Sequence, residues 1–222
     1  GLMPAKESLP FDAEEKLGIF KKYGITLLII PFRSALERDS AFEAGKIDGA
    51  INDIIGTALI SRGGKKAKIL RTIARSKKNV PVFRIMKAKD PGSSKDVAIS
   101  SNTVIEYVTD RIIEKNRSAA GLKKTDIKSV PLRMQLLLEG KVGWATIAEP
   151  LASYLELKGA GIAYTDEGVK GSQVLFMART DLDEPFRKQL LAAFDEISLE
   201  INKRKGELKD LLWAKLGLPA EL

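Results

Sequence analysis

The stretch Ile30-Pro31-Phe32-Arg33, followed by Ala44-Gly45-Lys46-Ile47, has a second copy further along the chain. The second copy is Val130-Pro131-Leu132-Arg133, followed by Glu139-Gly140-Lys141-Val142. Each copy has the pattern of a strand end, a turn at proline, a helix, a glycine cap and a new strand. Two related α/β units in one chain of 222 residues predict two similar lobes. Two such lobes leave a crevice between them that can enclose a small molecule.

The composition limits the chemistry that the chain can perform. A hydrophobic fraction of 44% is enough for apolar cores, and no run reaches the ~18 apolar residues of a membrane span. Without cysteine there are no disulfides or thiolates. Without histidine there is no Ser-His-Asp or Cys-His catalysis and no imidazole metal site. The chain also lacks P-loop spacing and a G-x-G-x-x-G motif, so we expect no nucleotide hydrolysis and no dinucleotide site. Our expectation for the whole chain is a protein that is not an enzyme and that uses no cofactor and no metal.

The chain is basic, with a formal net charge of +8 and a sequence pI near 9.5. The lysines are scattered in pairs, and none lies in an aromatic-interleaved run or a recognisable nucleic-acid motif. We interpret them as solvent-exposed side chains on loops and at helix ends, and we expect no nucleic-acid partner. An anionic ligand, or an anionic membrane surface nearby, is the alternative.

Strands and helices alternate at short spacing along the chain. We predict helices at 9–23, 36–44, 52–62, 102–116, 132–139, 150–157, 184–203 and 207–216. We predict strands at 25–30, 47–51, 69–74, 80–86, 97–100, 127–130, 142–147, 161–165 and 173–178. This alternation predicts an α/β fold with parallel sheets and right-handed crossovers.

The clearest internal linker is Lys89-Asp90-Pro91-Gly92-Ser93-Ser94, after which the α/β pattern starts again. We predict a first lobe from residues 1–88 plus 174–222. A second lobe, residues 89–173, is inserted in it. The chain then crosses between the lobes twice, near 88–92 and near 170–174, and two crossings form a hinge.

Five segments, in this order and at these spacings, carry a resemblance to a known family. They are Ala13 to Ile25, Phe42 to Ala50, Val97 to Thr103, Ala148 to Ala152 and Trp213 to Pro219. With them the chain resembles the periplasmic-type substrate-binding proteins of ABC importers, in the branch that binds sulfonates, nitrate and thiamine-pyrimidine precursors. The chain is short for this family, and its start looks clipped.

The resemblance implies a Venus-flytrap fold of two Rossmann-like lobes joined by a hinge. It implies that a small solute is captured between the lobes and delivered to the membrane permease of an ABC transporter. It also implies a monomer in the periplasm, or an extracellular protein anchored to a membrane. The sequence contains no recognisable signal segment.

Candidate ligand residues follow strands and open helices, because ligands of open α/β sheets lie beyond the carboxyl ends of the strands. Ser100, Ser101, Asn102 and Thr103 follow one strand, and their hydroxyls, free N–H groups and helix dipole suit a polar or anionic group. They are also ordinary helix caps. In the first lobe the matching places are Asn52, the better hydrogen-bonding group, and Asp53, which is equally well explained as a cap.

Further candidates lie at the other edges of the predicted cleft. Glu149, before Pro150, could accept hydrogen bonds from a ligand amine or amide. Its carboxylate could instead only interact favourably with the dipole of the helix that starts at Pro150. Phe11 could stack on a ring or belong to the core. The remaining candidates are Ser8, Leu9 and Pro10 on the cleft wall, Ser34 after a strand, and Phe83, Arg84, Ser172 and Gln173 beside the hinge.

Arg33 and Arg133 occupy corresponding positions of the repeat, and each could meet an acid group or be an exposed charge without a partner.

Three functions are compatible with a two-lobed chain of this kind. The preferred one is a binding protein for a small polar or anionic organic molecule. An enzyme of the same fold, of the menaquinone-pathway type, is a second. The third is the effector-binding domain of a transcription regulator or sensor kinase, although no winged-helix pattern is present.

Overall fold

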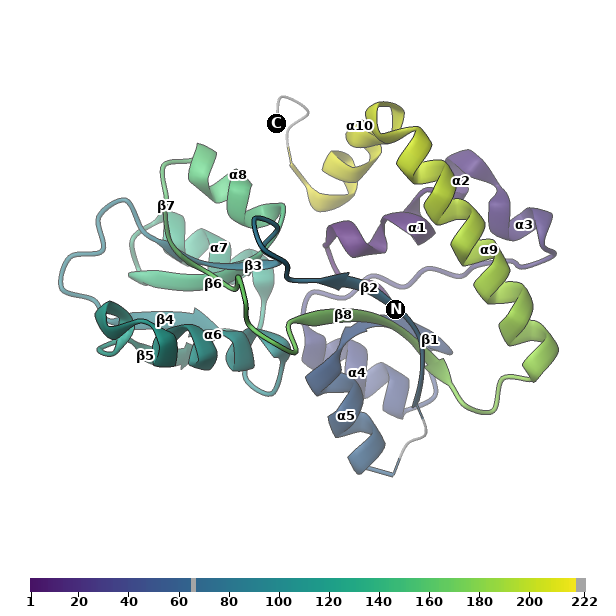
Figure 1. The fold of residues 1–222 in the computed structure, drawn as a ribbon, viewed down its shortest axis with the longest axis horizontal. Coiled ribbons are helices and arrows are strands. Elements are labelled where there is room, and N and C mark those ends of the chain that lie inside the picture. Colours follow the sequence, from purple (N-terminus) through teal and green to yellow (C-terminus); the bar gives the residue numbers. More distant parts are fainter. Residues whose placement is uncertain (65–66, 219–222) are drawn as a thin grey trace.

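The computed structural model describes residues 1–64 and 67–218. The chain forms two α/β lobes side by side, each built on its own β-sheet (Figure 1). Pro219 of the last resemblance segment, and the predicted lobe end at 222, lie outside the described residues. Among the described residues, no helix is long and apolar enough to cross a membrane.

The first lobe contains a three-stranded sheet in the order β1-β8-β2. The strands are β1 (Gly49–Asp53), β2 (Ala67–Arg75) and β8 (Gln173–Arg179). β8 is antiparallel to both neighbours, so the prediction of a parallel sheet is wrong for this lobe. The reason is that β8 returns from the other lobe and enters between β1 and β2 in the opposite direction.

The second lobe contains a five-stranded sheet in the order β5-β4-β6-β3-β7. The strands are β3 (Phe83–Lys87), β4 (Asp96–Ile99), β5 (Lys123–Asp126), β6 (Trp144–Ala148) and β7 (Gly161–Thr165). β4 is parallel to β5 and β6, as predicted, whereas β3 is antiparallel to β6 and β7. Because β3 pairs here, this sheet begins at residue 83, before the predicted lobe boundary at 88.

Helices of the first lobe pack on both sides of its sheet. They are α1 (Leu9–Asp12), α2 (Glu14–Leu17), α3 (Ile19–Lys22), α4 (Ala35–Glu43), α5 (Ile54–Arg62), α9 (Glu184–Lys203) and α10 (Lys205–Leu216). The single helix predicted over 9–23 is divided into three: a turn at Ala13 separates α1 from α2, and Gly18, with a left-handed φ of 61°, separates α2 from α3. The Glu14 carboxylate then accepts the N–H groups of Phe20 and Lys21, both at 2.8 Å, and fixes the start of α3.

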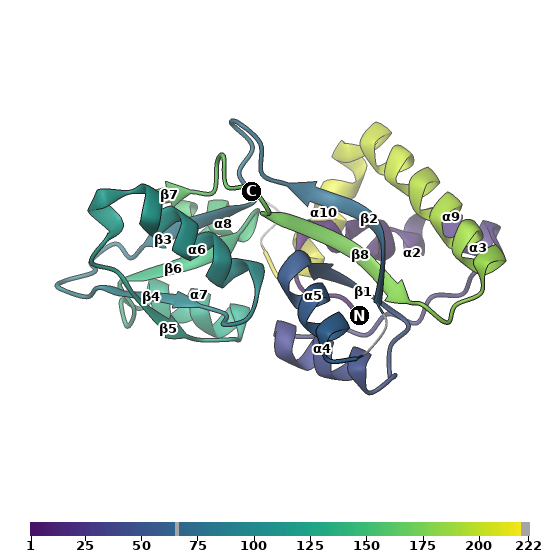
Figure 2. The same ribbon diagram turned by 60° about the horizontal axis from the view of Figure 1, so that its bottom comes forward.

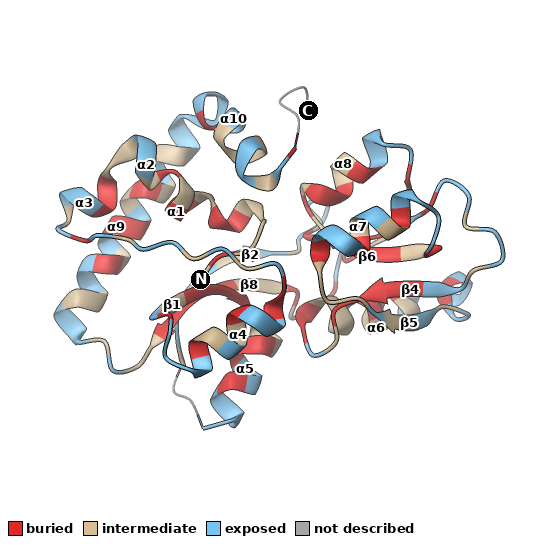
Figure 3. Ribbon diagram, turned by 180° about the vertical axis from the view of Figure 1, so that it is seen from behind, coloured by how far each residue is buried: buried red, intermediate tan, exposed pale blue. Residues whose placement is uncertain are grey.

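The second lobe carries α6 (Val104–Lys115), α7 (Val130–Leu138) and α8 (Leu151–Leu157). Buried positions follow the inner faces of these helices and the central strands (Figure 3). α10 is the exception to the division into lobes. Its Leu208 lies in the core of the first lobe, whereas Trp213 and Leu216 pack on the core of the second.

Two predicted strands are wrong. Residues 25–30 are extended but pair with no strand among the described residues. Residues 127–130 do not form a strand. The edge strand of this sheet is instead the polar segment Lys123–Asp126 just before them. In neither place does the run form a buried strand: Leu28 and Ile29 are exposed, and in 127–130 only Val130 is buried.

The chain crosses between the lobes at 76–82 and again at 166–172 (Figure 1 and Figure 2). The Ser76 N–H donates to the Ser172 carbonyl at 3.2 Å, so the two crossings are bonded to each other. Asp166 is fully buried between them, and its carboxylate accepts the Val82 N–H at 3.0 Å and the Ser172 hydroxyl.

Candidate functional site

A cavity of about 100 Å³ lies between the two lobes. The first lobe contributes Glu7, Ser8, Arg38, Asn52 and Asp53 to its lining. The second lobe contributes Phe83, Ser100, Thr103 and Arg133. The cavity therefore combines hydroxyls, two acids and two arginines with apolar walls.

Helices from both lobes begin at this cavity. In the second lobe, α6 is capped by the Thr103 hydroxyl, which accepts the Ile105 N–H at 3.1 Å, and α7 is capped by Ser129. In the first lobe, Ser34 caps α4 and Asp53 caps α5. Because the first turn of a helix carries free N–H groups and a partial positive charge, these four helix starts favour a ligand with negative or acceptor groups.

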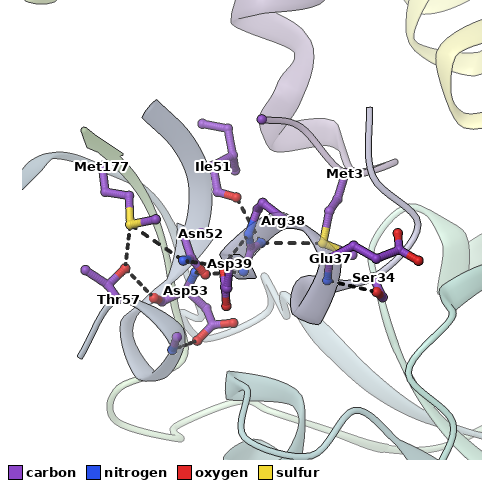
Figure 4. A network of polar contacts seen from close by, with 12 residues as sticks. Met3, Ser34, Glu37, Arg38, Asp39, Ile51, Asn52, Asp53, Thr57 and Met177 are labelled. Carbon is purple, nitrogen blue, oxygen red and sulfur yellow. Dashed lines mark hydrogen bonds and ion pairs between the residues drawn. The ribbon is translucent and has the colours of Figure 1, made fainter. Parts of the chain in front are cut away.

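Arg38 is 4% exposed and holds the first-lobe side of the cavity together (Figure 4). Its guanidinium donates to the Ile51 carbonyl at 3.0 Å, to Asp39 at 2.9 Å and to the Asn52 side-chain oxygen. The Asn52 amide in turn donates to Asp39 at 3.0 Å. The charge of Arg38 is therefore compensated within the protein, and the polar atoms of Asn52 already have partners.

Arg133 is the fully buried cation on the second-lobe side. It donates to the Ser100 hydroxyl at 2.7 Å and to the Ile127 carbonyl at 2.9 Å. Within residues 1–64 and 67–218 it forms no ion pair, and its Nε has no hydrogen-bond partner. Burial lowers the pKa of Arg133 to about 10, with Asp126 opposing the shift, so the side chain is charged at neutral pH.

The two acids at the cavity are almost completely buried. Burial raises the pKa of Glu7, which Lys6 opposes, and its Oε1 has no hydrogen-bond partner among the described residues. Burial also raises the pKa of Asp53, opposed by Arg38 and by the N–H groups of Gly56 and Val104. Both carboxyl groups are thus displaced toward the neutral form in this arrangement.

The lobes touch beside the cavity. Val104, the first residue of α6, presents its N–H to Asp53 of the first lobe. The N–H of Val130, the first residue of α7, donates to the Arg33 carbonyl at 3.4 Å. Two helix starts of the second lobe therefore meet polar groups of the first lobe, and the lobes are in contact beside the cavity.

Several of the residues predicted from sequence meet at the cavity. They are Ser8, Asn52, Asp53, Phe83, Ser100 and Thr103. Ser101 and Asn102 lie on an adjoining hollow of about 190 Å³, beside Lys128. Ser34 is buried as the α4 cap and does not line the cavity.

Other predicted residues lie away from the cavity. Phe11 packs against Phe20, Phe176 and Phe194 with ring centroids 5.0–5.7 Å apart, and it belongs to the first-lobe core. Leu9 and Pro10 lie on the same short helix. The structure therefore places Phe11 as a core aromatic rather than as a cleft wall.

Three of the remaining candidates, Arg84, Glu149 and Ser172, have partners within the protein. Arg84 pairs with Glu149, whose other oxygen accepts the Ser153 N–H at 3.2 Å and the Ser153 hydroxyl at 2.8 Å. Ser172 is bonded to Asp166, and Gln173 begins β8. None of these side chains lines the cavity between the lobes.

Sequence reasoning missed Glu7 and Arg38 and paired the wrong arginines. Arg38 lies four residues after Ser34, the cap of α4, and Arg133 lies four residues after Ser129, the cap of α7. Arg33 is exposed at the start of α4. Aligning the two copies on their capping serines, rather than on their prolines, would have identified Arg38. Glu7 carries no signal of this kind.

Two α/β lobes with two chain crossings and a cavity between them define the periplasmic binding protein fold. The structure is similar to the alkanesulfonate-binding protein SsuA from Xanthomonas axonopodis pv. citri bound to MOPS, with a TM-score of 0.83 and 17% identity over 99% of this chain and 79% of that one. It is also similar to the periplasmic aliphatic sulphonate binding protein SsuA from Escherichia coli, with a TM-score of 0.73 and 18% identity over 99% and 78% of the two chains.

A third similar structure is a Candida albicans gene product with the generic periplasmic binding protein structural fold. It has a TM-score of 0.76 and 13% identity over 99% of this chain and 76% of that one. No family model matches the sequence, and no curated protein matches it. The similarity to these solved structures confirms the predicted periplasmic binding protein fold.

Proposed function

We propose that this chain is the solute-binding component of an ABC import system, and that it encloses a small anionic or polar organic molecule between its lobes without chemical conversion. The observation that carries this proposal is Arg133, a buried cation with no carboxylate partner among the described residues. A buried charge is costly unless it is paired, so an acid group of a ligand would supply the missing partner.

The acid group would lie where Arg133, the Ser100 hydroxyl and the start of α6 converge. Arg133 donates to the Ser100 hydroxyl at 2.7 Å, and this hydroxyl donates to the Lys128 carbonyl at 3.2 Å, so the donor left for a ligand is the Arg133 guanidinium. Across the cavity, the unpartnered Glu7 Oε1 offers an acceptor to a donor group of the same ligand. The similar SsuA structures are sulfonate-binding proteins, which is consistent with an acid group here.

Binding would work through lobe closure. The Val104–Asp53 and Val130–Arg33 contacts exist only when the lobes are together, so a ligand that bridges the lobes would stabilise this state. The net affinity is the contact energy left after the cost of closing. The closed surface would then be recognised by a membrane permease outside the cytoplasm, with the binding protein acting as a monomer.

The test is native mass spectrometry of the purified protein, followed by denaturation and identification of any released molecule. Small-angle scattering with and without that molecule then measures closure. We expect a small acid-bearing solute and a more compact particle when it is bound. An identical particle shape with every candidate sulfonate, carboxylate and vitamin precursor would contradict the proposal.

A further inference from the structure

Two charged side chains at the cavity between the lobes, Arg133 and Glu7, have no partner of opposite charge among the described residues. They come from opposite lobes, and both are almost completely buried, with 0% and 5% of their surface exposed. Within 1–64 and 67–218, neither Arg133 Nε nor Glu7 Oε1 has a hydrogen-bond partner. The cavity therefore offers a buried cation on one side and a buried acceptor on the other.

The other two charged groups at this cavity are already compensated by the protein. Arg38 contacts Asp39 at 2.9 Å. The Asp53 carboxylate accepts the Gly56 N–H at 2.8 Å as the cap of α5, and Arg38 opposes the effect of its burial. A ligand in the cavity thus has two charges left to pair with, and they are of opposite sign.

Arg133 and Glu7 also do not pair with each other, although they line the same cavity. A buried charge is costly unless it is paired, so a molecule with opposite charges at its two ends would satisfy both residues. A simple anion would pair with Arg133 and leave Glu7 buried without a partner. Burial raises the pKa of Glu7, and an ammonium group beside it would hold the carboxylate in its charged form.

The rest of the cavity limits the part of the ligand that joins its charged ends. The volume is about 100 Å³. Since a cavity of about 150 Å³ can hold benzene, there is room for roughly four to seven non-hydrogen atoms. Most of the remaining lining is apolar and includes Phe83, Leu151 and Val174. Methylene groups suit such walls better than further polar groups, which would be buried without partners.

We propose that the ligand is a short aliphatic zwitterion, with its acid group on Arg133 and its protonated amine on Glu7. This inference rests on the proposed solute-binding function and narrows it from any small acid-bearing solute to one that also carries an amine. It assigns the recognition of the amine to Glu7 in the first lobe. A zwitterion held in this way contacts both lobes and therefore favours the state in which they are together.

The test uses two pairs of probes that differ only in the amine: β-alanine with propionate, and taurine with ethanesulfonate. Isothermal titration measures the affinity of the purified protein for each probe. We expect the zwitterion of at least one pair to bind about tenfold more tightly or better than its partner. Glu7→Gln should remove this preference and still bind the anion. Glu139→Gln, on an exposed side chain outside the cavity, is the matched control and should keep the preference.

Equal or tighter binding of the probes without an amine would overturn the proposal and leave solute binding itself intact. So would a preference for the amine that survives in Glu7→Gln. If none of the four probes binds, native mass spectrometry decides: a released solute with both an acid and an amine supports the proposal, and one without an amine overturns it. Absence of binding to every probe together with absence of a released solute would contradict the solute-binding function as well.

Discussion

Arg38 and Arg133 are equivalent residues of the two lobes. Each lies in the first turns of a helix, four residues after the serine that caps it, and each donates to a backbone carbonyl and to a polar side chain. They differ in charge compensation. Arg38 contacts Asp39 at 2.9 Å, whereas Arg133 has no ion-pair partner among the described residues. This asymmetry directs a ligand's acid group to the second lobe.

Replacing Arg133 with glutamine should weaken binding of an acid-bearing ligand. The variant keeps hydrogen-bonding groups but loses the buried charge, and hydrogen bonds to charged groups contribute about 1.5–3 kcal/mol, which is about 10- to 150-fold in affinity. Isothermal titration with the solute released from the native protein measures the effect. Arg33→Gln is the matched control, because Arg33 is exposed and should leave the affinity unchanged. Equal losses in both variants would exclude a direct role for Arg133.

The fold could be predicted from the sequence where local signals and tertiary structure agree. Asp53 caps α5 as expected, and Thr103 caps α6, because short polar side chains before an apolar helix satisfy free N–H groups locally. The segment 25–30 was predicted as a strand because its apolar run is typical of one. Whether it pairs depends on what lies beside it, which its own residues do not encode.

The site was predictable only in part, for a similar reason. Ser100 directly follows β4 and Asn52 is the next-to-last residue of β1, and a position near the end of a strand is visible in sequence. Glu7 enters the cavity because the short helices after it fold across the sheet, and no local pattern marks this. The antiparallel β8 depends on the return of the chain from the other lobe, which is a property of topology rather than of the residues 173–179.

Glu7 and Asp53 should make the stability of the closed protein depend on pH. Burial raises the pKa of both, so the folded protein binds more protons than the unfolded chain, and stability falls as the pH rises above the ordinary values of 4.5 and 3.8 toward the raised ones. The double variant Glu7→Gln with Asp53→Asn should lose this decline and keep the α5 cap. Urea unfolding of both proteins between pH 4 and pH 8 measures the difference, in which the titration of all other carboxylates cancels. Parallel pH profiles would contradict the assignment.

Asp166 should be important for the hinge. Its buried carboxylate accepts the Val82 N–H from one crossing and the Ser172 hydroxyl from the other. Asp166→Ala leaves both donors without this partner, and an unsatisfied buried group costs about 1–3 kcal/mol. We expect a lower urea midpoint and a wider range of lobe orientations by scattering. Asp181→Ala, on an exposed loop beside Arg179, is the control and should behave like the parent protein. A parent-like Asp166→Ala would show that the crossings are held by other contacts.

α10 should influence lobe closure, because it packs on both lobes. Leu208 anchors it in the first-lobe core, and Trp213 packs on the second-lobe core. Trp213→Ala removes contacts that exist only with the lobes together, so it should enlarge the ligand-free particle in scattering and weaken solute binding. Leu208→Ala should instead lower the free energy of unfolding by about 2–5 kcal/mol, because it leaves a cavity in a core. Leu199→Ala, on the exposed face of α9, should change neither property. If Trp213→Ala destabilises the fold without altering particle size or affinity, α10 is a structural helix of the first lobe and has no part in closure.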